Sequence, residues 1–183
     1  TSSLVGSEMC IRDRIETEQY EPAFDEGIWQ LDEEVRAIAD NTELPTFENT
    51  IIALERSGKL LDKVISAFFN VLNAEADDEM MDISQRVSPK LSESSNNIYL
   101  NEQLFARVKS VYDRKDELHL PMEDARLLEK TFEAFCARGA ALGPEEKEKY
   151  RKLSSELSLL SLTFDQNALK DKNRYEPVSY THL

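Results

Sequence analysis

Residues 45–73, PTFENTIIALERSGKLLDKVISAFFNVLN, decide the fold of this chain. Their apolar residues recur every three or four positions, which predicts two helices that meet at Gly58. Thr46 stands where it can cap the first turn. The second helix carries the broader apolar stripe, so we expect it to have neighbours on two sides and to lie centrally in a bundle. The two stripes are Phe47, Ile51 and Leu54, then Leu60, Leu61, Val64, Ile65, Phe68, Phe69 and Leu72.

The same helical period continues on both sides of this pair. A long amphipathic helix is expected at about 17–40, followed by a connector at 41–45. Pro89 should kink or split the helix that contains it, and Gly139 should close a later one. Residues expected at helix starts are Asp77 or Asp78, Asn101, Pro121 and Pro144.

The last predicted helix is the longest, and its apolar residues suit packing against two earlier helices. They are Tyr150, Leu153, Leu157, Leu160, Phe164 and Leu169. No run alternates apolar and polar residues over the length of a strand. The sequence therefore predicts an all-α fold, a bundle of about six to eight helices.

Charge and composition exclude several classes of partner. The formal net charge is −14, with 36 acidic against 22 basic residues, so neither nucleic acid nor a membrane is an expected partner. The two cysteines, Cys10 and Cys136, are too few for a disulfide framework, and Cys136 is expected to be a buried thiol. Both are compatible with a reducing compartment.

The two ends differ in character from the rest of the chain. Residues 1–14, TSSLVGSEMCIRDR, and residues 178–183, VSYTHL, show no helical period. Both resemble translated sequencing adapters, so we expect them to be non-native tails around a helical domain at 15–177. On that interpretation Cys10 and His182 have no functional meaning.

The sequence contains no pattern of side chains typical of a catalytic centre. Asp116 and His119 are spaced for a shared metal, but a lone pair at a helix end is more often simply exposed. The acidic triplet Asp77, Asp78 and Glu79 lacks the spacing of a calcium loop, and capping explains it better. Serines 92, 94 and 95 have no nucleophile motif.

Three segments together resemble a known family. They are PTFENTIIALERSGKLLDKV at 45–64, SPKLSESSNNIYLNEQLFARVKSVYDRKDEL at 88–118 and RLLEKTFEAF at 126–135. In this order, they resemble the N-terminal helical region of the thimet-oligopeptidase-like zinc metallopeptidases, over about residues 15–176. The nearest branch is that of the bacterial dipeptidyl carboxypeptidases, followed by that of oligopeptidase A.

The resemblance implies a larger helical peptidase, in which these residues form part of a channel wall that admits only short, unstructured peptides. Family members bind zinc through H-E-x-x-H and a downstream glutamate. This chain has only His119 and His182, so we expect it to contain no catalytic, cofactor-binding or metal-binding residue. Zinc and the catalytic domain would belong to the full-length parent.

Several questions stay open at this stage. A free-standing acidic helical interaction module without activity is the alternative to a peptidase fragment, and a generic acidic bundle is a third possibility. The residues do not decide between dipeptide removal and internal cleavage. We expect a cytoplasmic location, with the periplasm as the alternative.

Overall fold

Helices dominate the computed structural model, which describes residues 15–75 and 78–174. These residues contain no strand, which confirms the predicted all-α class. The elements are η1 (Thr17–Gln19), α2 (Tyr20–Ala39), the π-helical η2 (Phe47–Ile52), α3 (Ala53–Arg56), α4 (Lys59–Glu75), α5 (Asp78–Tyr99), α6 (Glu102–Tyr112), α7 (Met122–Ala137) and α8 (Pro144–Arg174).

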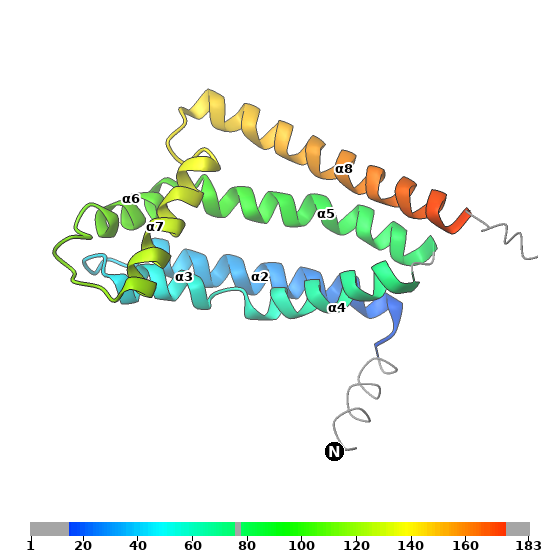
Figure 1. Ribbon diagram of the computed structural model, residues 1–183, viewed down its shortest axis with the longest axis horizontal. Helices are drawn as coiled ribbons and strands as arrows, with labels where there is room; N and C mark the ends of the chain where they lie inside the picture. The colour runs from blue at the N-terminus through cyan, green and yellow to red at the C-terminus, as the bar shows by residue number, and fades with distance from the viewer. Residues whose placement is uncertain (1–14, 76–77, 175–183) are drawn as a thin grey trace, which may run out of the picture.

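Four long helices run side by side, with α8 against α5, α5 against α2 and α2 against α4 (Figure 1), and we call this group of four helices the layer. Helices α2 and α5 run in one direction, and α4 and α8 run in the other. Helices α6 and α7 close one end of the layer, where they pack against each other and against η2. Two apolar clusters hold this arrangement together.

The first cluster fills the contact between α2, α4 and α5. Its centre is Phe68, which is fully buried and packs edge-on against Tyr20 and Phe24 at ring-centroid distances of 5.0 and 5.3 Å. Aromatic rings favour such edge-to-face contacts because the positive edge of one meets the negative face of the other. The buried residues of this cluster are Tyr20, Phe24, Leu61, Phe68, Leu72, Met80, Ile83 and Val87.

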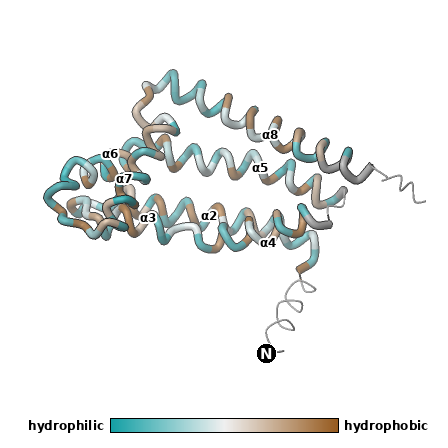
Figure 2. Tube along the Cα trace, in the orientation of Figure 1, coloured by the Kyte–Doolittle hydropathy of each residue, from teal (hydrophilic) through white to brown (hydrophobic). Residues whose placement is uncertain are grey.

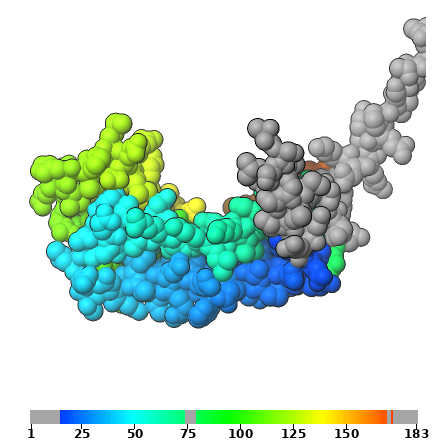
Figure 3. Space-filling model, turned by 90° about the horizontal axis from the view of Figure 1, so that it is seen from below, coloured from blue at the N-terminus to red at the C-terminus, as the bar shows by residue number. Residues whose placement is uncertain are grey.

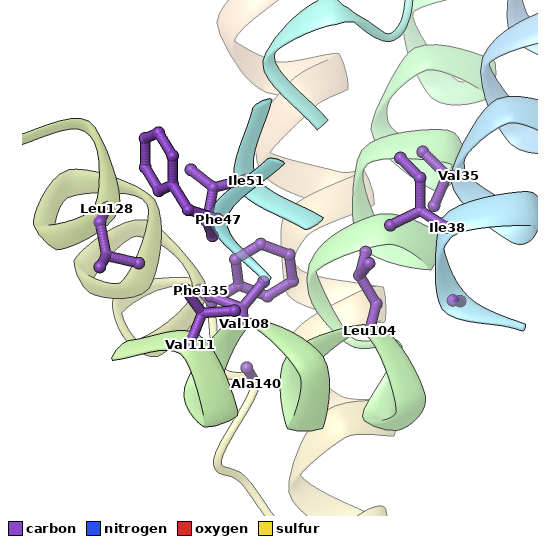
Figure 4. Close-up of a cluster of buried hydrophobic side chains, with 11 residues drawn as sticks. Val35, Ile38, Phe47, Ile51, Leu104, Val108, Val111, Leu128, Phe135 and Ala140 are labelled. Carbon is purple, nitrogen blue, oxygen red and sulfur yellow. The ribbon is translucent and has the colours of Figure 1, made fainter. Parts of the chain in front are cut away.

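The second cluster joins the end of α2 to η2, α6 and α7 (Figure 4). Its buried residues are Val35, Ile38, Ala39, Phe47, Ile51, Leu104, Val108, Val111, Leu128, Phe135 and Ala140. Because it draws side chains from segments far apart in the chain, it fixes the closed end of the layer.

The central helix of the layer is α2, and the prediction that the helix of residues 60–72 lies centrally is wrong. Helix α2 packs against α4, α5 and α6, whereas the extensive contact of α4 is with α2 and only some of its side chains meet α5 in the first cluster. Leu60 is 37% exposed, and Phe69 is only partly buried. The broad stripe of α4 wraps around the side of α2 and reaches the apolar residues of α5, which accounts for its width.

Gly27 allows α2 and α4 to approach closely. A methyl group added there would lie 3.1 Å from the Leu61 Cα and 3.2 Å from its Cδ1. We therefore expect Gly27→Ala to lower the free energy of unfolding by about 1 to 3 kcal/mol, even though alanine favours the helix. Urea denaturation measures it, with Gly143→Ala as control, since a methyl there meets only the end of Glu146. A stabilised Gly27→Ala would contradict the close approach.

The predicted caps and breaks are largely confirmed. Thr46 accepts a hydrogen bond from the Asn49 amide at 3.1 Å, and Asn49 Oδ1 accepts one from the Thr46 amide at 2.8 Å. Gly58 has a φ of 74° between α3 and α4, and its amide donates to Glu34 Oε2 at 2.8 Å. Asn101 caps α6 through the Leu104 amide at 2.9 Å.

Two further predictions have other outcomes. Helix α5 continues through Pro89 and is not split there. Asp77 and the Asp78 side chain, predicted as alternative N-caps, lie outside what the structure describes.

Candidate functional surfaces

The candidate metal ligands Asp116 and His119 are both exposed in the turn between α6 and α7. His119 has a φ of 46°, a conformation that a histidine adopts more readily than a bulky residue. Among residues 15–75 and 78–174, no group of three or more His, Cys, Asp or Glu side chains is placed to hold a metal ion. Of the acidic triplet, only the exposed Glu79 side chain is described.

The three serines of α5 form contacts between helices. Ser94 is buried and donates to Asp32 Oδ1 of α2 at 3.2 Å. Ser92 lies 3.4 Å from the Ser154 hydroxyl of α8, and Ser95 accepts from Arg138 at 3.2 Å. Each serine thus has a hydrogen-bond partner that helps to position α5. Cys136, in contrast, is exposed, and the prediction of a buried thiol is wrong.

A cavity of about 340 Å³ lies between α7 and the adjoining ends of α2, α3 and α5. Its apolar lining includes Val35, Leu54, Tyr99, Leu127 and Phe135. Seen from below, α6 and α7 stand up at one end of α2 to α4 (Figure 3).

Two of the polar side chains that line this cavity have hydrogen-bond partners. Ser57 donates to the Leu54 carbonyl at 2.7 Å, and Lys130 pairs with Glu133 at 2.5 Å. The cavity has the size and polarity to accept an apolar side chain.

The contact between α5 and α8 is mostly polar. Gln166 is buried and bonds to Gln85 at 3.0 Å and to the Ser84 hydroxyl at 3.2 Å. Ser154 donates to Asn96 Oδ1 at 3.3 Å and Arg151 donates to Asn97 Oδ1 at 2.8 Å, while Lys147 joins α8 to Glu102 of α6. Helix α8 therefore turns its polar side toward the rest of the chain.

The opposite side of α8 is apolar and exposed, so the prediction that this stripe is buried is wrong. Four of its residues expose about two thirds of their surface: Leu153 65%, Leu157 64%, Leu160 67% and Phe164 71%. Apolar residues recur along α8 at the outer edge of the layer (Figure 2). Tyr150 is half-buried, and the Leu169 side chain lies outside the described ones.

No helix in the described part of the chain combines the length and the apolar character needed to cross a membrane. The four most exposed apolar residues of α8 lie on one side of the helix, while Leu159, 40% exposed, and the half-buried Leu162 lie off that side.

Comparison with known proteins identifies relatives of this chain. No protein-family model matches the chain. Curated relatives do match it, and all three described here are peptidases by name. The chain is 43% identical over 157 residues to a dipeptidyl carboxypeptidase of Escherichia coli (strain K12), which is 86% of this chain and 23% of the relative.

The other two relatives agree with this result. A dipeptidyl carboxypeptidase of Salmonella typhimurium is 40% identical over the same share of each chain. A thimet-like oligopeptidase of Dictyostelium discoideum is 27% identical over 86% of this chain and 24% of the relative. The chain is therefore homologous to a part of the dipeptidyl carboxypeptidases, and it spans about a quarter of their length. This confirms the resemblance found in the sequence.

Proposed function

We propose that this chain is the N-terminal helical part of a zinc metallopeptidase that hydrolyses short oligopeptides. It forms part of the channel wall that limits substrate size, while the chemistry belongs to a catalytic domain outside the chain. The observation that carries the proposal is the 43% identity to a dipeptidyl carboxypeptidase over 86% of the chain. Dipeptide removal and internal cleavage both remain within this proposal, and the proposed location is the cytoplasm.

The architecture supports a role as a wall. A layer of four long helices, closed at one end by α6 and α7, is held by two apolar clusters. Such a layer presents a fixed surface, because buried interlocking side chains resist deformation. A fixed wall excludes folded substrates sterically without contributing a reactive group.

The described residues do not fit a zinc site. Zinc in a peptidase needs three protein ligands and an open position for water or substrate. The structure places no three such side chains together in the part of the chain that it describes. We place the zinc in the remainder of the parent enzyme, because the sequence contains no pair of histidines at ligand spacing.

Exchange of segments tests the proposal. A chimera of the E. coli dipeptidyl carboxypeptidase, with its homologous segment replaced by residues 15–174 of this chain, should cleave short peptides. It should reject the same peptides when they are embedded in a folded protein. An inactive chimera with native helicity would support the alternative, a free-standing acidic interaction module.

The 183-residue chain alone should show no chelator-sensitive cleavage of a quenched oligopeptide in the presence of zinc. The reason is that the sequence contains no pair of histidines at ligand spacing. Fluorescence release, with the active chimera as positive control, measures this. Turnover that EDTA abolishes and zinc restores would refute the assignment of chemistry to the rest of the parent.

A further inference from the structure

The exposed side of α8 forms a continuous apolar surface, which we call the α8 stripe: Leu153, Leu157, Leu160 and Phe164. Their spacing of four, three and four residues places them within about 60° around the helix axis, over a length of about 17 Å. Ser158, which bonds to the Ser88 carbonyl of α5, projects from roughly the opposite side. The stripe thus points away from the layer.

This orientation is the reverse of that of an ordinary surface helix. A surface helix buries its apolar side and exposes its polar side. Helix α8 instead forms hydrogen bonds with serine, asparagine and glutamine side chains of α5. Its four stripe residues are left exposed to solvent. Exposed apolar patches of this kind mark interaction surfaces.

The area of the stripe argues against a second copy of the chain as its partner. Four side chains, each about two thirds exposed, present roughly 300 to 400 Å² of apolar surface. A stable complex between separate chains buries about 800 Å² on each partner. A segment tethered in the same polypeptide needs less area, because its effective concentration is high.

Charge argues against a membrane surface. The exposed residues beside the stripe include Lys149 and Lys152 but also Glu148 and Glu156, so the helix has no basic excess there. Peripheral membrane helices carry lysine and arginine along the polar side to bind anionic lipids.

The length of the relatives indicates which partner covers the α8 stripe. About three quarters of a dipeptidyl carboxypeptidase lies outside the matched segment, since the match covers 23% of it. We infer that the α8 stripe is a docking surface for an apolar face on that remainder of the same peptidase. This inference rests on the proposed function and adds the surface through which the helical layer is joined to the catalytic part.

The test uses the active chimera described above and two matched pairs of substitutions. The first pair is Leu157→Glu with Leu160→Glu, in the middle of the stripe. The control pair is Ser161→Glu with Thr163→Glu, at exposed polar positions of the same helix. Both pairs add the same charge, and glutamate favours a helix about as well as leucine does.

The stripe pair should lower the melting temperature of the chimera by roughly 5 °C or more, and the control pair by less than about 2 °C. In the 183-residue chain alone, where the stripe is exposed, both pairs should shift melting by less than about 2 °C. The stripe pair should also make α8 of the chimera more sensitive to limited proteolysis.

The outcomes separate the two claims. A chimera without peptidase activity overturns the proposed function, and the docking inference falls with it. An active chimera in which the stripe pair behaves like the control pair overturns the docking inference alone. A 183-residue chain that dimerises, and becomes monomeric with the stripe pair, would assign the stripe to a second copy and overturn the inference too.

Discussion

Phe68→Ala should lower the free energy of unfolding by roughly 3 to 5 kcal/mol, the largest effect expected from a single change in this chain. The side chain is fully buried, and its ring lies 5.0 Å from that of Tyr20, 5.3 Å from that of Phe24 and 5.2 Å from that of Phe69. Removing it costs the transfer free energy of the ring and leaves a cavity between α2 and α4. Chemical denaturation of the 183-residue chain gives the value.

Three further variants make this measurement specific. Phe69→Ala should cost roughly half as much as Phe68→Ala, because Phe69 is only partly buried. Lys59→Ala and Lys63→Ala, at exposed positions of the same helix, should cost less than about 0.5 kcal/mol. Equal costs for the two phenylalanines would show that Phe69 is covered as fully as Phe68, contrary to its partial burial.

Arg107→Met should lower the free energy of unfolding by about 3 kcal/mol, the second largest effect. The Arg107 guanidinium is buried and donates to the carbonyls of Asn41 and Glu43 at 2.5 and 3.0 Å. It also donates to Asn49 Oδ1 and Thr50 Oγ1 at 3.1 and 3.3 Å. Methionine fills the space but leaves the carbonyls of Asn41 and Glu43 without the guanidinium donor.

The control is Arg126→Met, an exposed arginine on α7, which should change stability by less than about 0.5 kcal/mol. Arg107→Lys should recover only part of the loss, because an ammonium group cannot reproduce the planar fork that reaches four oxygens. Chemical denaturation of the three variants gives the free energy of unfolding of each. If Arg107→Met left the free energy of unfolding unchanged, the connector at 41–45 would be held by its own caps and not by Arg107.

Local features of the fold were predictable from the sequence, because they depend on residues close together in the chain. The Thr46 cap, the break at Gly58 and the Asn101 cap need only three or four neighbouring residues. The family resemblance likewise rested on segments with their residues in order, and the relatives confirm it. The sequence also contains no metal-ligand motif to place in the chain.

The order of the helices in the layer was not predictable in the same way. The width of an apolar stripe says how much of a helix is covered but not by which neighbour, so the stripe of α4 does not tell whether α2 or α4 is the central helix. The sequence feature that indicates the central position of α2 is Gly27, which is buried against Leu61 of α4. A single glycine inside a helix is ambiguous until its neighbour is known.

The α8 stripe shows a second limit of pattern reasoning. Periodicity locates an apolar side, but whether this chain covers that side depends on partners that the pattern does not contain. Serines and glutamines on the opposite side match polar groups on α5, and this pairing decides which side of α8 faces inward.

The two contacts that α5 makes within the layer should respond differently to salt. Toward α2, Lys90 pairs with Asp25 at 2.6 Å and Arg86 with Glu21 at 3.0 Å, and the hydrogen bond to Asp25 raises the pKa of Lys90. These exposed ion pairs weaken as the ionic strength rises, because mobile ions screen the charges. Toward α8, most bonds are between neutral hydroxyl and amide groups, which screening leaves nearly unchanged. A rise in ionic strength therefore weakens the ion pairs between α5 and α2, while the hydrogen bonds between α5 and α8 stay nearly unchanged.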